Sequence, residues 1–191
     1  SHSVTVLAVF DNEETGSLTK QGADSTFLDE VLKRISLASG KDEEGHYRAV
    51  SSSFMVSADN AHAVHPNHPE KADPINRPMI NKGIVIKFNA AQHYTTDAVS
   101  CAVYRDLCES NDIPVQVFTN RSDTRGGSTL GNVSNAHVSL NTVDIGLAQL
   151  AMHSCYETVG ARDTKHLVDA MTIFYSKTFR VDASGSFELL D

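Results

Sequence analysis

The sequence predicts an α/β fold, in which helices and strands alternate along the chain and pack around one sheet. Two patterns indicate it: short apolar runs typical of buried strands, and longer segments whose apolar residues recur every three or four positions. A third observation is size, because 191 residues suffice for one domain with a substantial core. Neither an internal repeat nor a domain boundary is visible, so we expect one layered α/β domain.

Composition argues against several other classes of protein. The hydrophobic share of 40% and the charged share of 21% are ordinary for a globular protein. The net charge of -8, without a basic stripe, argues against a nucleic-acid surface. No apolar run approaches the roughly 20 residues of a membrane span, and no signal peptide is visible. An odd number of cysteines without CxxC spacing predicts reduced thiols at Cys101, Cys108 and Cys155. We therefore expect a cytoplasmic protein without a nucleic-acid or membrane partner.

The chain is expected to open with a strand and a helix. Residues 6–10 are an apolar run that predicts a buried strand. Apolar residues over 27–35 have helical spacing, with Asp24 or Ser25 as the candidate N-cap and Gly40 just past the end.

Two further strands are predicted before the middle of the chain. A charged loop over 41–45 leads to a predicted strand over 49–58, which ends at Asp59. The stretch 60–81 contains four prolines, and inside a compact domain it predicts a long ordered loop, a kind of segment that is often functional. Residues 84–88 predict a short strand.

The second half continues the alternation of helices and strands. Its predicted elements are a helix over 97–109, a strand over 114–119, a polar Gly-rich loop over 121–132 and a strand over 138–145. Asp163 is the predicted N-cap of a last helix, and the tail from Asp182 is predicted to be frayed or an edge strand.

Acidic and imidazole side chains stand at the ends of predicted strands, at Glu13, Glu14, Asp59 and His153. Strand ends at one edge of an α/β sheet converge in space. Two carboxylates and an imidazole suit a divalent ion such as zinc, and another carboxylate could act as general base on a metal-bound water. Spacing alone leaves a solvated acidic turn open, because Asp and Glu are usually exposed and no short metal motif such as HExxH is present.

Several segments, in order, resemble the M18 metalloaminopeptidases, the aspartyl aminopeptidase family. The resemblance runs from about Val4 to Phe179. The matching segments are Asp11-Asn-Glu-Glu-Thr-Gly-Ser17 with Gln21-Gly-Ala23, Ser57-Ala-Asp-Asn-Ala-His-Ala-Val-His-Pro-Asn67, Asn81-Lys-Gly-Ile-Val-Ile-Lys87, Tyr94-Thr-Thr96, Gly127-Ser-Thr-Leu-Gly131, Thr142-Val-Asp-Ile-Gly146 and Leu150-Ala-Met-His-Ser154.

The resemblance implies a role for seven residues. Glu13 matches the general base that takes a proton from the metal-bridging water. The implied metal ligands are Glu14 on one ion with His153, and Asp59 on the other; the implied pocket residues are Lys87, Tyr94 and, as a pocket or supporting group, His62. Lys87 would favour an N-terminal Asp or Glu in the substrate. The 126–129 loop could line the pocket with backbone donors, and a plain turn explains it equally well.

The resemblance also implies the fold, the cofactor and the partners. It implies a three-layer α/β/α sandwich with a mixed central sheet that lacks its first strands, two zinc ions, a peptide substrate and large homo-oligomers. Family members carry an additional metal-ligating His, a bridging Asp and a dimerisation domain upstream of the matching segments. Residues 1–191 are therefore expected to be the C-terminal part of the catalytic domain, at most weakly active without the N-terminal half. The alternatives are a catalytically silent structural or binding chain, and a related di-zinc exopeptidase.

Overall fold

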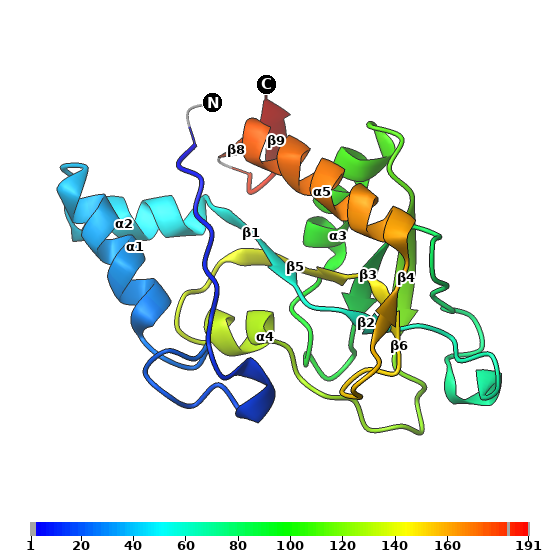
Figure 1. Cartoon of the computed structure of the whole chain (residues 1–191). Coiled ribbons are helices and arrows are strands. Elements are labelled where there is room, and N and C mark those ends of the chain that lie inside the picture. The colour runs from blue at the N-terminus through cyan, green and yellow to red at the C-terminus, as the bar shows by residue number, and fades with distance from the viewer. Residues whose placement is uncertain (1–2, 183, 191) are drawn as a thin grey trace.

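A computed structural model describes residues 3–182 and 184–190, in which a mixed four-stranded sheet carries helices on both faces (Figure 1). The strands lie in the order β1 (Phe54–Ala58), β5 (Asn141–Gly146), β3 (Ile84–Phe88) and β4 (Val115–Thr119). β1 pairs in parallel with β5, and β3 pairs in parallel with β4, whereas β3 and β5 are antiparallel. The prediction of an α/β fold with a mixed sheet is confirmed.

Alternate residues of the central strands point to different layers. Ile84, Ile86, Val143 and Ile145 pack against α3 (Ala98–Glu109) and α5 (Ala161–Ser176) in the main core. The opposite face carries the short helix α4 (Leu130–Asn135), which packs against β1 and β5. Helices on both faces of the sheet make the three predicted layers.

Polar side chains occupy the face of the sheet that α4 covers. Lys87 and Asp144 alternate with the core residues of β3 and β5, and both are almost completely buried. Because a buried charge needs partners, the face that carries Lys87 and Asp144 is a candidate position for a functional site.

Three smaller units complete the fold. Helices α1 (Phe27–Ala38) and α2 (Glu43–Ser51) contact each other and lie at the side of the sheet beyond β1 (Figure 1). A second sheet joins β2 (Ala61–His62), β6 (Ala148–Leu150) and β7 (Thr158–Val159), and the tail forms a hairpin of β8 (Thr178–Val181) and β9 (Phe187–Leu190). Two single turns of 3-10 helix are η1 (Glu13–Thr15) and η2 (Pro69–Lys71). Among residues 3–182 and 184–190, no helix combines the length and the apolar character that a membrane crossing requires.

The predicted opening strand is wrong for the chain as described. Residues 4–10 have no regular structure, and the side chains of Leu7 and Val9 are 77% and 81% exposed. A strand needs a neighbour for its backbone N–H and C=O groups, and no segment of the described chain pairs with this one. The apolar pattern alone could not supply that neighbour.

The prediction of a loop over 41–45 and a strand from residue 49 is also wrong, because α2 occupies most of this stretch. Asp42 caps the helix, and its carboxylate accepts a hydrogen bond from the backbone N–H of Gly45 at 2.8 Å. Glu43 and Glu44 then stand in the first turn, where negative charge favours a helix. The strand begins only at Phe54.

Asp163 does not cap the last helix, which begins after Gly160. The Asp163 side chain is fully buried, and its carboxylate accepts hydrogen bonds from the backbone N–H groups of Asn81 (2.6 Å) and Gly83 (2.8 Å). It therefore fastens the segment before β3 to α5, a long-range contact that a local capping pattern cannot reveal.

Candidate active site

A cavity of about 560 Å³ opens on the face of the sheet opposite α3 and α5, near the carboxyl end of β1. Its wall comes from segments far apart in the sequence: η1, the residues after β1, β3, the Gly-rich loop and the turn after β6. All seven residues to which the resemblance gives a role line it, namely Glu13, Glu14, Asp59, His62, Lys87, Tyr94 and His153. The fold thus brings the candidate residues to one place.

Glu14 and His153 form the most direct contact between candidate ligands. The imidazole Nε2 lies 2.8 Å from the carboxylate Oε2, and both side chains are about two-thirds exposed. Asn12 and Gly16 flank η1 with positive φ angles of 59° and 113°, which bend the chain so that both glutamates leave the segment at the cavity. His153 also has a positive φ, 67°, and its backbone N–H donates to the carboxylate of Glu157 at 2.6 Å.

Glu13 stands beside this pair in a more enclosed position. Burial raises the pKa of its carboxyl group, and the negative charges of Asp59 and Glu14 raise it further, while His153 and Lys87 oppose the shift. A carboxyl group with a raised pKa holds a proton more readily near neutral pH, which suits a group that must accept a proton and later release it.

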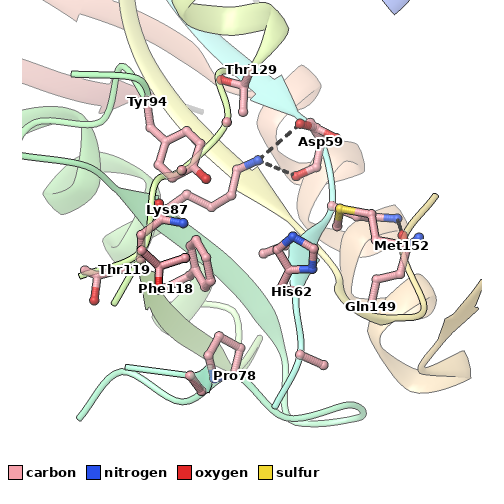
Figure 2. Close-up of a pocket in the computed structure, with 18 of the residues that line it drawn as sticks. Asp59, His62, Pro78, Lys87, Tyr94, Phe118, Thr119, Thr129, Gln149 and Met152 are labelled. Carbon is pink, nitrogen blue, oxygen red and sulfur yellow. Dashed lines mark hydrogen bonds and ion pairs between the residues drawn. The ribbon is translucent and has the colours of Figure 1, made fainter. Parts of the chain in front are cut away.

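Lys87 and Asp59 make the second contact between candidate residues. The Lys87 Nζ donates to the backbone carbonyl of Asp59 at 2.8 Å and lies 3.4 Å from its Oδ2 (Figure 2). The Lys87 side chain is only 2% exposed, and burial lowers its pKa. The ammonium group also lies 5.0 Å from the centre of the Tyr94 ring, within the range of a cation–π contact. The charge of Lys87 is therefore engaged by Asp59 and Tyr94.

Tyr94 and His62 lie on different sides of the same space (Figure 2). The Tyr94 ring packs 6.2 Å from the Phe118 ring and is 8% exposed, and burial raises the pKa of its hydroxyl group. Partial burial, followed by the nearby positive charges of His153 and Lys87, lowers the pKa of His62. His62 is therefore biased toward the neutral imidazole, which can accept one hydrogen bond and donate another.

These donors make only part of a zinc site. Glu14 and His153 could hold one ion together, but Asp59 is engaged by Lys87, and the described part of the chain contains no group of three or more His, Cys, Asp or Glu side chains that could hold a metal. A catalytic zinc usually takes about three protein ligands. The described residues therefore do not fit a complete metal centre.

Several polar residues around this cavity have no role implied by the family resemblance. Lys71, Arg121, Arg125, Asn60 and Gln149 line it, and Asp144 lies buried beneath it. Among these residues, Asp144 could have been identified from the sequence, because it is a carboxylate in the middle of an apolar strand within a matched segment. Arg121 and Arg125 belong to the Gly-rich loop, which does line the cavity.

Comparison with known proteins gives consistent matches. Residues 1–175 match the family model described as aminopeptidase I zinc metalloprotease (M18). The probable M18 family aminopeptidase 2 of Clostridium acetobutylicum is 54% identical over 176 residues, which are 92% of this chain and 41% of that protein.

Solved structures agree with this result. A cryo-electron microscopy structure of the Ape4 and Nbr1 complex contains a chain that is 42% identical, with a TM-score of 0.84 over 87% of this chain and 31% of that one. The dodecamer of S. cerevisiae mApe1 gives 33% identity and a TM-score of 0.77, over 87% of this chain and 36% of that one. The chain thus spans about two-fifths of the relative's length and about a third of each solved chain.

Proposed function

Because this chain belongs to the M18 family of zinc metalloproteases, we propose that it supplies part of the active site of an aminopeptidase, an enzyme that removes N-terminal residues from peptides. The observation that carries the proposal is the cavity, which gathers Glu13, the Glu14–His153 pair and the Asp59–Lys87 pair from four separate segments. Because the chain spans about two-fifths of its relative, we propose further that residues 1–191 act as the C-terminal part of a larger catalytic domain.

In this proposal Glu13 is the general base. Its carboxylate would take a proton from the water that attacks the first peptide carbonyl, and would then give the proton to the leaving amine. The raised pKa of Glu13 supports this role, because a carboxylate with a higher pKa is a stronger base and takes up the proton of the water more readily. The negative charges of Glu13, Glu14 and Asp59 also suit the ammonium group at the peptide's N-terminus.

Metal dependence is part of the proposal, since the family is described as zinc metalloproteases. Glu14 and His153 would supply two of the donors, and the remaining donors would come from the rest of the larger catalytic domain or from Asp59 after it leaves Lys87. Zinc, when bound, polarises a carbonyl group and lowers the pKa of water.

We also propose a preference for acidic N-terminal residues. Lys71 and Arg125 are exposed cations that line the cavity, and a substrate carboxylate could pair with either. Because one similar structure is a dodecamer of mApe1, self-assembly into a homo-oligomer is a further part of the proposal, which light scattering of the complete protein would test.

The test of activity uses a chimera in which this chain replaces the matching 176-residue region of the Clostridium acetobutylicum relative. We expect the chimera to release p-nitroaniline from aminoacyl substrates, a chelator to abolish the activity and zinc to restore it. Glu13→Gln should lower kcat by about 10²–10⁴-fold, the usual contribution of a general base. Glu44→Gln, which removes an exposed carboxylate from α2, is the matched control and should leave kcat unchanged.

The rival hypothesis is that this chain keeps the fold but has only a structural or binding role, without catalytic activity. The same experiment separates the two, because an inactive chimera that folds and binds no zinc would support the rival and contradict the proposal. The isolated 191-residue polypeptide should be at most weakly active, since the described residues offer only part of a metal-ligand set.

A further inference from the structure

Asp144 is the most deeply buried carboxylate near the cavity, and the proposed chemistry does not use it. It lies in the middle of β5, with no exposed surface. It does not line the cavity; it lies under the two loops that do. Burial of an ionised carboxylate is costly unless several donors satisfy it, so its contacts indicate what it holds in place.

The first of these contacts fixes the loop between β3 and α3, here called the Tyr94 loop (residues 89–96). The Asp144 Oδ2 accepts hydrogen bonds from the Thr95 backbone N–H at 2.5 Å and from the Thr95 hydroxyl at 2.8 Å. The backbone N–H of Asp144 donates to the Thr96 hydroxyl at 2.8 Å. The residue directly before these anchors is Tyr94, whose ring lies over Lys87 at the cavity wall.

The second contact fixes the Gly-rich loop between β4 and α4 (residues 120–129). The Thr129 hydroxyl donates to Asp144 Oδ1 at 3.1 Å. The chain then passes so close to β5 that a Cβ on Gly131 would lie 2.7 Å from Asp144 Oδ1 and 2.4 Å from the Ser57 hydroxyl. Only glycine allows this close approach. The residues that precede it in the loop, including Arg125, line the cavity.

The third feature is charge. The antiparallel register that pairs Ile86 with Ile145 places Lys87 opposite Asp144 on the same face of the sheet. The negative charge of Asp144 favours the ammonium form of Lys87, as does that of Asp59. A single carboxylate therefore connects both loops and the buried cation of the cavity.

We propose that Asp144 is a positioning residue for the substrate cavity, which holds the Tyr94 loop and the Gly-rich loop in the arrangement that receives the substrate. The part about substrate rests on the proposed aminopeptidase function; the part about the loops does not. Asp144 touches neither substrate nor reacting atoms in this proposal and acts through Tyr94 and Thr129.

The first experiment measures amide hydrogen exchange of the purified chain. In Asp144→Ala, the Thr95 and Thr129 donors lose their acceptor, and exchange over residues 92–97 and 126–131 should become at least about tenfold faster. In Asp144→Asn, the side-chain carbonyl can still accept from Thr95 while the amide donates to the Thr129 hydroxyl, so exchange should stay within about threefold of the original rate.

The matched control is Asp163→Ala, which removes another fully buried carboxylate that accepts several hydrogen bonds, in its case from the backbone N–H groups of Asn81 and Gly83. It should accelerate exchange over residues 79–84 and change the two cavity loops by less than about twofold. Unchanged exchange of both loops in Asp144→Ala, or an equal increase in Asp163→Ala, would overturn the proposal.

A milder variant covers the case in which Asp144→Ala does not fold. Thr129→Val keeps the shape of the side chain and removes only its hydroxyl donor, so exchange over 126–131 should rise by about threefold or more while 92–97 stays as it was. If 126–131 is also unaffected there, Asp144 does not hold this loop and the proposal fails.

The second experiment measures kinetics in the chimera. Asp144→Ala should raise KM by about tenfold or more, Asp144→Asn should recover most of that loss, and Asp163→Ala should change KM by less than about twofold. Unchanged KM in Asp144→Ala would overturn the substrate part. If the unmodified chimera is inactive, the proposed function fails, and the exchange experiment still decides whether Asp144 holds the loops.

Discussion

Lys87 is a buried cation in the cavity wall. Its Nζ donates to the backbone carbonyl of Asp59, and its side chain is 2% exposed. A substrate carboxylate would have to displace Asp59 to reach it. Arg125, by contrast, is an exposed cation on the Gly-rich loop at the same cavity. The contacts thus favour Arg125 for recognition of an acidic side chain and Lys87 for support of Asp59.

This difference predicts a specific pattern in the chimera. Arg125→Ala should lower kcat/KM for an N-terminal Glu substrate about tenfold more than for an N-terminal Ala substrate, since a charge-assisted contact is worth roughly 1.5–3 kcal/mol. Lys87→Met should lower kcat/KM for both substrates by a similar factor. The measurement is the ratio of the two kcat/KM values in each variant.

If Lys87→Met instead lowers kcat/KM only for the N-terminal Glu substrate, Lys87 recognises the acidic side chain, as the family resemblance implies. A second substrate pair, N-terminal Asp and Asn, keeps the size of the side chain nearly constant and isolates the effect of charge.

At the scale of elements, the residue directly before β3 occupies a position that only glycine tolerates. Gly83 has a φ of +110°, and a Cβ there would lie 2.1 Å from the carbonyl oxygen of Pro114. The same segment is held by Asp163, whose carboxylate accepts the Gly83 N–H. The strand β3 starts at the next residue, so the backbone at Gly83 is confined by both Pro114 and Asp163.

Gly83→Ala is therefore expected to destabilise the chain by about 3 kcal/mol or more, because the strain of a positive φ adds to a clash with backbone atoms that cannot move aside. Urea unfolding of the purified chain measures the change in the free energy of unfolding. Gly127→Ala is the matched control, since a Cβ there meets no atom within 4 Å and φ is not in the positive range. A change below 1 kcal/mol in Gly83→Ala would contradict the close approach to Pro114.

Sequence patterns predicted elements well where the signal is local. The helix that begins after Asp97 has the capping box formed by Asp97 and Ser100, and its predicted bounds match α3. The strand β3 matches its prediction, because four of its five residues are buried as a continuous run. The helix α2 was missed because its charged first turn looks like a loop until Asp42 is recognised as the cap. The small sheet of β2, β6 and β7 was missed because strands of two or three residues have no periodicity to detect.

At the scale of the whole molecule, the position of the candidate residues beside one cavity agrees with the family resemblance, whereas their contacts could not be predicted from the sequence. Nothing in the order of residues indicates that Lys87 meets Asp59, or that Asp144 meets Thr95 and Thr129, since these pairs are 28, 49 and 15 positions apart. Such contacts depend on strand register and on the path of loops. The sequence shows a carboxylate within an apolar strand at Asp144, but it does not indicate the hydrogen-bond partners of that carboxylate.

The chain as described leaves an apolar segment without a place in the sheet. Residues 4–10 contain Val4, Leu7 and Val9, each at least three-quarters exposed, although their pattern predicts a buried strand. β1 stands at the edge of the main sheet. Exposed apolar side chains in a row are unfavourable in water, and an edge strand has backbone groups free to pair. We therefore predict that further polypeptide of the complete protein pairs with this segment.

Hydrogen exchange of residues 4–10 tests the prediction. In the isolated chain these amides should exchange at nearly the rate of an unstructured peptide, because no strand in the described residues pairs with them. In the chimera, which restores the remainder of the relative, the same amides should become at least about a hundredfold slower, the protection typical of a paired strand with a stability of roughly 3 kcal/mol. Residues 84–88 in β3 serve as the internal control, since they are already buried and paired and should be protected in both proteins. Equal, rapid exchange of residues 4–10 in an active chimera would show that the segment stays unpaired, and that its apolar side chains serve a purpose other than completing the sheet.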